Sequence, residues 1–396
     1  MMAESSISPA EAATKVQEPL RSELTFSPRD FSMVIALLAI WAFFTFMTTT
    51  YVSARNLSNL SVEFSITAVL ALGMFLVILP GEIDLSAGSG VGLFGGIAAV
   101  LVFFRDWPAP LALLLALVLA VAIWAAMGAL IVKEKIPAFI ITLAGMLIFK
   151  GIHWWVIGST TVPIRVGSAP TLFTVLTTWY LPPAAGLALA GIIVAALVRA
   201  GLINRKQRIE GELPVDSPDL AYSRIFIAGQ IVLLFVILVN QHLGIPLPAL
   251  ILGFTAFAIH TITRHTRFGR HLFAIGGNAE AAALSGIPVD RVVIGAFAIA
   301  GGIVALTGFM QTAYTGTSTS TVGAEMELDA IAACVIGGTS LRGGRGSVAG
   351  VLFGALIMAS LLNGMTLMAV HPEDKLIARG IVLAAAVWMD VRMKRN

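Results

Sequence analysis

Long apolar stretches separated by short polar segments run along almost the whole chain after residue 30. A helix needs about 20 consecutive apolar residues to cross a bilayer core. In lipid such segments satisfy their backbone hydrogen bonds as helices, and the alternating pattern of an outer-membrane barrel is absent. The apolar runs predict spans at 31–50, 64–80, 88–104, 108–132, 136–157, 184–202, 224–241, 246–263, 292–313, 348–368 and 374–391.

One further apolar stretch, 328–340, is too short for a full crossing. It predicts a half-helix, or one arm of a crossing that bends at the glycines of 343–346. The fold class that follows is all-α: a polytopic integral membrane protein with ten to twelve transmembrane helices.

The composition supports this fold class, because 58% of the residues are hydrophobic and only 12% are charged. Ordinary soluble domains have about 25% charged residues. Lysine and arginine gather in the connections near 133–135, 199–224 and 264–291 and at the C-terminal end, which predicts that these segments are cytoplasmic. The predicted topology is N-in and C-in.

The predicted domain organisation is simple. Residues 1–30 form a polar cytoplasmic tail without the apolar core of a signal peptide, and 31–396 form a single transmembrane domain. Within that domain, 203–222 is expected to be a cytoplasmic linker and 264–291 a cytoplasmic loop. The single cysteine, Cys334, lies in an apolar stretch and is expected to be a buried packing residue.

The sequence lacks the common catalytic, nucleotide-binding and metal-binding motifs. The sequence contains no G-x-x-x-x-G-K-[ST] phosphate loop, no H-E-x-x-H and no cluster of its six histidines. We therefore predict no catalytic residue, no metal and no cofactor in this chain.

Acidic residues between two predicted spans are the clearest candidates for a functional role. Glu82, Asp84, Ser86 and Ser89 lie between apolar stretches that together barely provide two crossings. Asp84 either caps the following helix or marks a helix break that lines a solute pathway, and one residue can do both.

A second acidic cluster, Glu325, Glu327 and Asp329, resembles the first, which suggests an internal repeat. Asn363 is a polar residue within an apolar span. It is expected to make interhelical hydrogen bonds, with contact to a polar solute as the alternative.

The loop 264–291 contains signals of a short surface helix. Asn278 can cap a helix over 279–285, and Gly286 and Pro288 would end it. A surface helix between two crossings is typical of a docking site for a soluble protein.

This loop resembles the coupling helix of ABC importer permeases, whose signature is Glu-Ala-Ala, three residues and Gly. Here Glu280, Ala281, Ala282 and Gly286 match, but the Ile-x-Leu-Pro tail of the maltose-type permeases is missing. The chain is similar instead to the monosaccharide permeases of the ribose, xylose and arabinose group, through 82–89, 269–287 and 333–350. The stretches 51–56, 142–147 and 358–365 are most similar to the D-xylose members of this group.

The resemblance implies a homodimeric permease subunit in the bacterial inner membrane. A cytoplasmic ABC ATPase would dock at the residues from Asn278 to Gly286, and a periplasmic sugar-binding protein would deliver the solute. The lack of a phosphate loop agrees with ATP hydrolysis by a partner. The alternative is an ion-coupled secondary sugar transporter, for which Glu82 and Asp84 are the plausible ion carriers.

Overall fold

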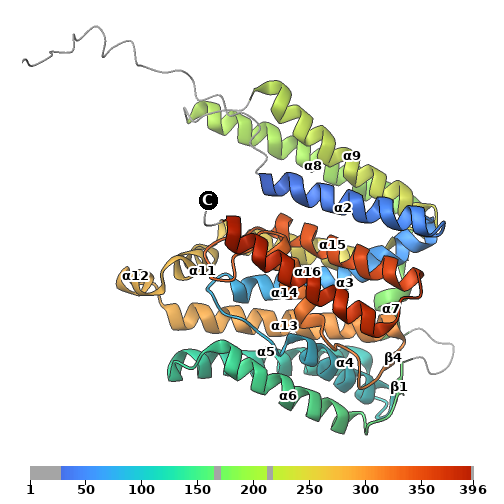
Figure 1. The fold of residues 1–396 in the computed structure, drawn as a ribbon, viewed down its shortest axis with the longest axis vertical. Coiled ribbons are helices and arrows are strands. Elements are labelled where there is room, and N and C mark those ends of the chain that lie inside the picture. Colours follow the sequence, from blue (N-terminus) through green and yellow to red (C-terminus); the bar gives the residue numbers. More distant parts are fainter. Residues whose placement is uncertain (1–27, 165–170, 212–216, 394–396) are drawn as a thin grey trace, which may run out of the picture. The chain divides into compact units, whose positions relative to one another are not determined.

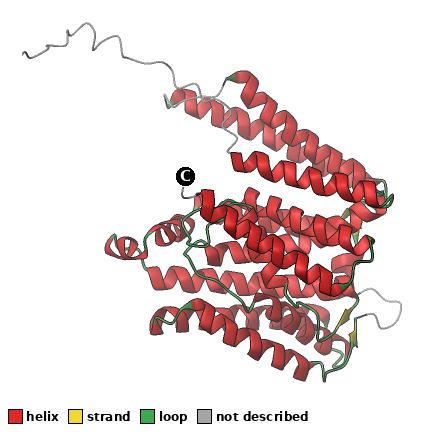
Figure 2. Cartoon of the chain, viewed as in Figure 1, coloured by secondary structure: helices red, strands yellow, loops and turns green. Residues whose placement is uncertain are grey.

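The computed structural model describes residues 28–164, 171–211 and 217–393, and these residues are mostly helical (Figure 2). The chain divides into two compact units, one of Met1–Pro28 with Ala184–Ile237, the other of Arg29–Pro183 with Leu238–Asn396. The second, here called the main unit, contains every candidate residue named above. The predicted cytoplasmic tail falls almost entirely outside the described residues.

The main unit consists of two runs of helices. The first run is α2 (Pro28–Met47), α3 (Ala54–Ile78), α4 (Ala87–Phe103), α5 (Ala109–Glu134), α6 (Ala138–Val156) and the short α7 (Leu172–Thr178). The second run is α10 (Leu247–His265), α11 (Arg267–Gly277), α12 (Ala279–Leu284), α13 (Val289–Thr315), α14 (Met326–Ile336), α15 (Val348–Leu367) and α16 (Pro372–Met393). Two short antiparallel pairs link the runs: β1 (Val162–Pro163) with β4 (Thr317–Ser318), and β2 (Tyr180–Leu181) with β3 (Ile245–Pro246).

The smaller unit consists mainly of α8 (Pro183–Glu210) and α9 (Pro218–Asn240). The side chain of Ile225 in α9 occupies the space beside Gly201 in α8, so these two helices pack closely. Both helices extend into 203–222, so the described part of this predicted linker is largely helical.

Eight helices in the described ranges are long and apolar enough to cross a membrane, and α2 and α4 contain shorter apolar segments. The chain is therefore an all-α, polytopic membrane protein, as the apolar runs predicted.

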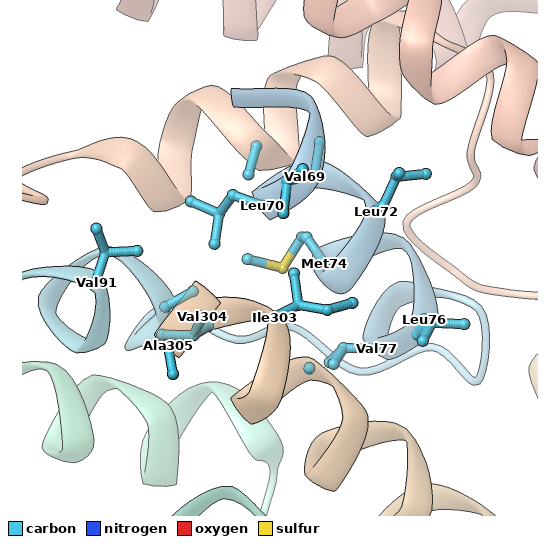
Figure 3. Close-up of a cluster of buried hydrophobic side chains, with 14 of the residues drawn as sticks. Val69, Leu70, Leu72, Met74, Leu76, Val77, Val91, Ile303, Val304 and Ala305 are labelled. Carbon is cyan, nitrogen blue, oxygen red and sulfur yellow. The ribbon is translucent and has the colours of Figure 1, made fainter. Parts of the chain in front are cut away.

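Helix α3 is the centre of the main unit, with 83% of its most apolar window buried. Figure 3 shows its apolar side chains, from Val69 to Val77, beside Val91 of α4 and residues 303–305 of α13. The contact is close because Gly73 has no side chain: a Cβ there would collide with Ile303. Cys334 is buried as predicted, with its Sγ 3.3 Å from the carbonyl oxygen of Ala71.

Glycines also bring α4 and α13 together. A Cβ on Gly308 would meet the carbonyl oxygen of Val91 at 2.5 Å, and one on Gly95 would meet that of Gly308 at 2.7 Å. Small residues at helix contacts let backbones approach in this way, which is a common basis of helix packing in membranes.

The long helices of the main unit run between two distinct ends (Figure 1). One end carries α11 and α12 and is called the α12 end. The other carries β1 and β4 and is called the strand end. The direction of each helix is given relative to these two ends.

In the main unit, two helices that carry candidate residues or contact them, α3 and α11, differ from the sequence prediction. Helix α3 begins at Ala54 rather than at 64, because the Ser53 hydroxyl caps it by accepting from the N–H of Asn56 at 3.3 Å. Within the helix, Ser61 and Ser65 donate their hydroxyls to carbonyl oxygens three and four residues earlier. The polar first half of α3 is thereby compatible with a helix. The segment 267–277, expected to be an irregular loop, is helix α11, capped by the Thr266 hydroxyl, which accepts from the N–H of Gly269 at 3.2 Å.

Candidate functional site

The chain between α3 and α4 is not helical, and the carboxylate of Asp84 is fixed within it. Asp84 is 1% exposed. Its Oδ1 accepts hydrogen bonds from the N–H and the hydroxyl of Ser86 at 2.8 and 2.5 Å. Its Oδ2 accepts one from Nε1 of Trp124, in α5, at 2.7 Å. Ser86 is the N-cap residue of α4, so the carboxylate fixes the turn that leads into α4 and ties it to α5.

The other residues predicted for this region gather at the same break. Ser86 is buried, and Glu82 and Ser89 are half-buried. The break also contains Gly81, whose φ of 97° favours glycine. The four predicted residues from Glu82 to Ser89 therefore lie together, whereas Asn363 lies in a different part of the main unit.

A second break precedes α14, and its acidic residues are arranged differently. Arg379 of α16 donates from Nη1 to Oε2 of Glu325, and its Nε lies within ion-pair distance of Oδ1 of Asp329, both at 3.2 Å. Glu327 is buried, and within the described residues its Oε2 has no hydrogen-bond partner. One arginine thus holds two of three carboxylates.

The two breaks meet at the first turn of α4. A Cβ on Gly88 would collide with Oε2 of Glu327 and with the carbonyl oxygen of Gly323. From this meeting point α4 continues toward the strand end, where it contacts β1 and β4. Helix α14 continues toward the α12 end (Figure 1). The two acidic clusters that resemble each other in sequence therefore lie at the facing starts of two short, oppositely directed helices.

The short helix expected after Asn278 is present as α12. The Oδ1 of Asn278 accepts from the N–H of Ala281 at 2.9 Å, and Gly286, with φ of 82°, follows its end. Ala282 is buried and anchors the helix, whereas Glu280 and Ala281 are exposed. Leu284, which the sequence analysis did not single out, is 90% exposed, so α12 presents an apolar side chain at its tip.

A junction of backbone contacts links α11 to the segment that enters the break before α4 and to the loop that follows α14. The N–H of Gly344, in the loop between α14 and α15, donates to the carbonyl oxygen of Leu79, at the end of α3, at 2.9 Å. Gly276 of α11 packs directly onto both, since a Cβ on Gly276 would collide with each. Movement of α11 would therefore reach the segments that lead into α4 and out of α14.

An open pocket of about 580 Å³ lies beside this junction. It is lined by Gly276, Gly277, Ser340, the two glycines 343–344, and the exposed Arg342 and Arg345. The α12 end thus combines an exposed helix with a positively charged hollow, a surface suited to an acidic protein partner.

Asn363 lies in a separate polar cluster. Its Oδ1 accepts from Nδ2 of Asn56 at 2.9 Å, and its Nδ2 donates to Oε2 of Glu63 at 3.0 Å. The hydroxyl of Tyr314 donates to Oε1 of Glu63 at 2.8 Å. Asn363 therefore makes the interhelical hydrogen bonds expected of it. Glu63 and Tyr314 were missed, because each lies just outside a predicted span, Glu63 before 64–80 and Tyr314 after 292–313. The apolar residues on both sides of Glu63 are the signal that could have placed it in a helix.

Comparison with known proteins identifies relatives along nearly the whole chain. A family model described as "Branched-chain amino acid transport system / permease component" matches residues 56–387. The "Xylose transport system permease protein XylH" of Escherichia coli (strain K12) is 42% identical over 369 residues, which cover 92% of each chain.

Other relatives extend this likeness. The protein of the same name from Haemophilus influenzae is 43% identical over 92% of this chain and 96% of its own length. The "Ribose import permease protein RbsC" of Escherichia coli (strain K12) is 32% identical over 90% of this chain and 92% of its own length. No solved structure matches the chain.

Proposed function

We infer the function from one premise: the chain belongs to the family of permease components of branched-chain amino acid transport systems. It is the permease subunit of a monosaccharide ABC importer and a multi-pass protein of the inner membrane. We propose D-xylose as its solute, because the relatives named for xylose share more of the sequence than those named for ribose.

We propose further that α12 is the docking element for a cytoplasmic ABC ATPase. The observation that supports this proposal is the junction of Gly276, Leu79 and Gly344. There α11, which leads directly into the exposed, capped α12, is in backbone contact with the segment that enters the break before α4 and with the loop that follows α14. Glu280, Ala281 and Leu284 would meet the partner, while Ala282 anchors the helix. Asn278 and Gly286 would set the start and the end of the docking helix.

In this mechanism the ATPase supplies the energy and the permease chain converts it into helix movement. Displacement of α12 would pass through α11 and the junction to the loop that follows α14, and through it to α14. Because packed interfaces switch between discrete arrangements rather than deforming continuously, such a displacement can open a pathway on one side while closing it on the other. A second copy of the chain would complete the pathway. A sugar-binding protein would deliver the solute at the strand end, with the α12 end and both chain termini in the cytoplasm.

The ion-coupled alternative relies on Glu82 and Asp84 as ion carriers. The carboxylate of Asp84 accepts three hydrogen bonds and fixes the turn before α4, so binding an ion there would require breaking that arrangement. This geometry favours a structural role for Asp84 and supports the ATP-driven mechanism.

The proposal is tested by uptake of radiolabelled D-xylose into proteoliposomes that contain the chain, with its ATPase and binding protein added in turn. We expect uptake only with both partners and ATP. Uptake by the chain alone, driven by an ion gradient, would overturn the mechanism, and competition by L-leucine but not by D-ribose would overturn the sugar assignment.

The docking element is tested in the same liposomes with Glu280→Lys and with Gly286→Leu. We expect each variant to insert normally, to lose transport and to lose the stimulation of ATP hydrolysis by the permease. Full transport by both variants would contradict docking at α12. The matched control is Glu210→Gln, in α8, where the carboxylate is exposed and forms a surface ion pair with Lys206, 3.7 Å away.

A further inference from the structure

Glu63 is a carboxylate in the outer half of the most deeply buried helix of the main unit, yet it is itself only half-buried. Within the part of the chain that the structure describes, no cation pairs with it. Ionisable groups inside membrane helices are rare and generally face a polar cavity or pathway rather than lipid. The position therefore calls for a polar neighbour.

The exposed face of α3 around Glu63 is polar. Asn59 is exposed and Thr67 is half-buried, and the three residues are spaced by four, so they lie on one face of the helix. Most other positions of α3 between Leu60 and Ile78 are buried and apolar. A stripe of this kind is unsuited to contact with lipid and fits a water-filled space.

Helix α13 contributes polar groups to the same place. Gln311 is half-buried and Tyr314 is exposed, and their spacing of three puts them on one face. Since the Tyr314 hydroxyl bonds Glu63 at 2.8 Å, the polar faces of α3 and α13 converge. Asn363, held by Asn56, adds an amide from α15.

The hydrogen-bonding capacity of this cluster is only partly used. Among the residues that the structure describes, one oxygen of Glu63 accepts a hydrogen bond from Tyr314 and the other accepts one from Asn363, and a carboxylate has about four acceptor sites. The phenol oxygen of Tyr314 can accept in turn, and Gln311 offers both a donor and an acceptor. The cluster is thus prepared to bind neighbouring hydroxyl groups.

We propose that Glu63, Tyr314 and Gln311, with Asn59 and Thr67 alongside, form a binding site for an uncharged polyhydroxyl solute within the translocation pathway. The inference rests on the proposed function and deepens it, because it names the residues that form hydrogen bonds to the sugar inside the membrane. Glu63 accepts hydrogen bonds from adjacent sugar hydroxyls, while Tyr314 and Asn363 fix the position of its carboxylate.

The test is binding of D-xylose to the full-length chain, in complex with its ATPase in nanodiscs, followed by saturation-transfer NMR without the sugar-binding protein. We expect a signal from wild type that Glu63→Gln and Tyr314→Phe weaken at least about tenfold, because sites built to bond a hydroxyl discriminate strongly. Glu210→Gln, on the exposed surface of α8, is the matched control and should keep the wild-type signal.

A purely structural role for Glu63 predicts another result: lower thermal stability, with the signal per folded molecule unchanged. That result, or wild-type signal in both variants, overturns the proposal. If Glu63→Gln does not fold, the D-xylose signal of Thr67→Val tests the proposal instead, because this variant removes one hydroxyl from the same face of α3 and should weaken the signal. Wild-type uptake that depends on ATP and both partners, combined with unaffected binding in these variants, would refute this site while leaving the importer function intact.

Discussion

The two helix breaks of the main unit share a location but not a design. The break before α4 is held by neutral donors: both carboxylate oxygens of Asp84 accept hydrogen bonds, from Ser86 and from the indole of Trp124. In the described part of the chain, the break before α14 is held by one cation, Arg379, which is shared between Glu325 and Asp329, and one oxygen of Glu327 has no hydrogen-bond partner. A buried carboxylate whose two oxygens are both hydrogen-bonded resists rearrangement, whereas a buried carboxylate with one oxygen left unbonded favours rearrangement. We infer that the α4 break is the fixed one and the α14 break the one that moves.

The variant Asp84→Ala should have the largest effect. It leaves two buried donors, the indole N–H of Trp124 and the backbone N–H of Ser86, without their acceptor, and each unsatisfied buried donor costs about 1–3 kcal/mol. We expect the free energy of unfolding in detergent, followed by tryptophan fluorescence in denaturant, to fall by about 3 kcal/mol. Asp84→Asn retains one acceptor oxygen, so its free energy of unfolding should lie between those of wild type and Asp84→Ala. Wild-type stability of Asp84→Ala would refute the fixed design of this break.

Gly88→Ala examines the point where the breaks meet. The added methyl group collides with Glu327 and Gly323, and overpacking of this kind costs about 1–3 kcal/mol. We expect lower thermal stability by differential scanning fluorimetry and a marked loss of transport. Gly151→Ala, in α6, where the new methyl group meets no neighbour, is the matched control. Equal stability of the two variants would show that the contact at Gly88 is loose.

Arg379→Gln separates movement from stability at the α14 break. The Arg379 side chain is 24% exposed, so its loss should cost about 1–2 kcal/mol, less than the 3–5 kcal/mol typical of a fully buried pair. We expect transport in proteoliposomes to change more than stability, with partial recovery in Arg379→Lys. If stability and transport fall in the same proportion, the α14 break is as fixed as the other.

The exposed helix α12 gives the smallest expected change in stability. Surface substitutions that break no cap or buried contact usually remain within about 0.5 kcal/mol. Glu280→Lys should therefore leave the thermal unfolding of the chain unchanged while it abolishes transport. A stability loss similar to that of Arg379→Gln would mean that α12 supports the fold as well as the partner.

The sequence predicts the parts of this architecture that depend on local pattern. Apolar runs located most of the spans, and the Asn278 cap located α12, because both signals lie within one helix. The length of α3 was underestimated, since serines that bond their own backbone resemble loop residues when only the sequence is considered.

The candidate site is less accessible from sequence because its contacts join distant residues. No local sequence signal indicates that Trp124 donates a hydrogen bond to Asp84, that Arg379 forms an ion pair with Asp329, or that Tyr314 donates a hydrogen bond to Glu63. These pairings follow from how the helices pack. Composition and spacing can name a charged residue in an apolar stretch, but not the partner that determines what it does.

The burial of Cys334 has a practical consequence. A thiol that is fully enclosed and hydrogen-bonded to Ala71 does not react readily with maleimide reagents. A cysteine introduced at Leu284 or Thr67 would then be the only reactive thiol in the chain, so spectroscopic probes can be attached to the native background without first replacing Cys334.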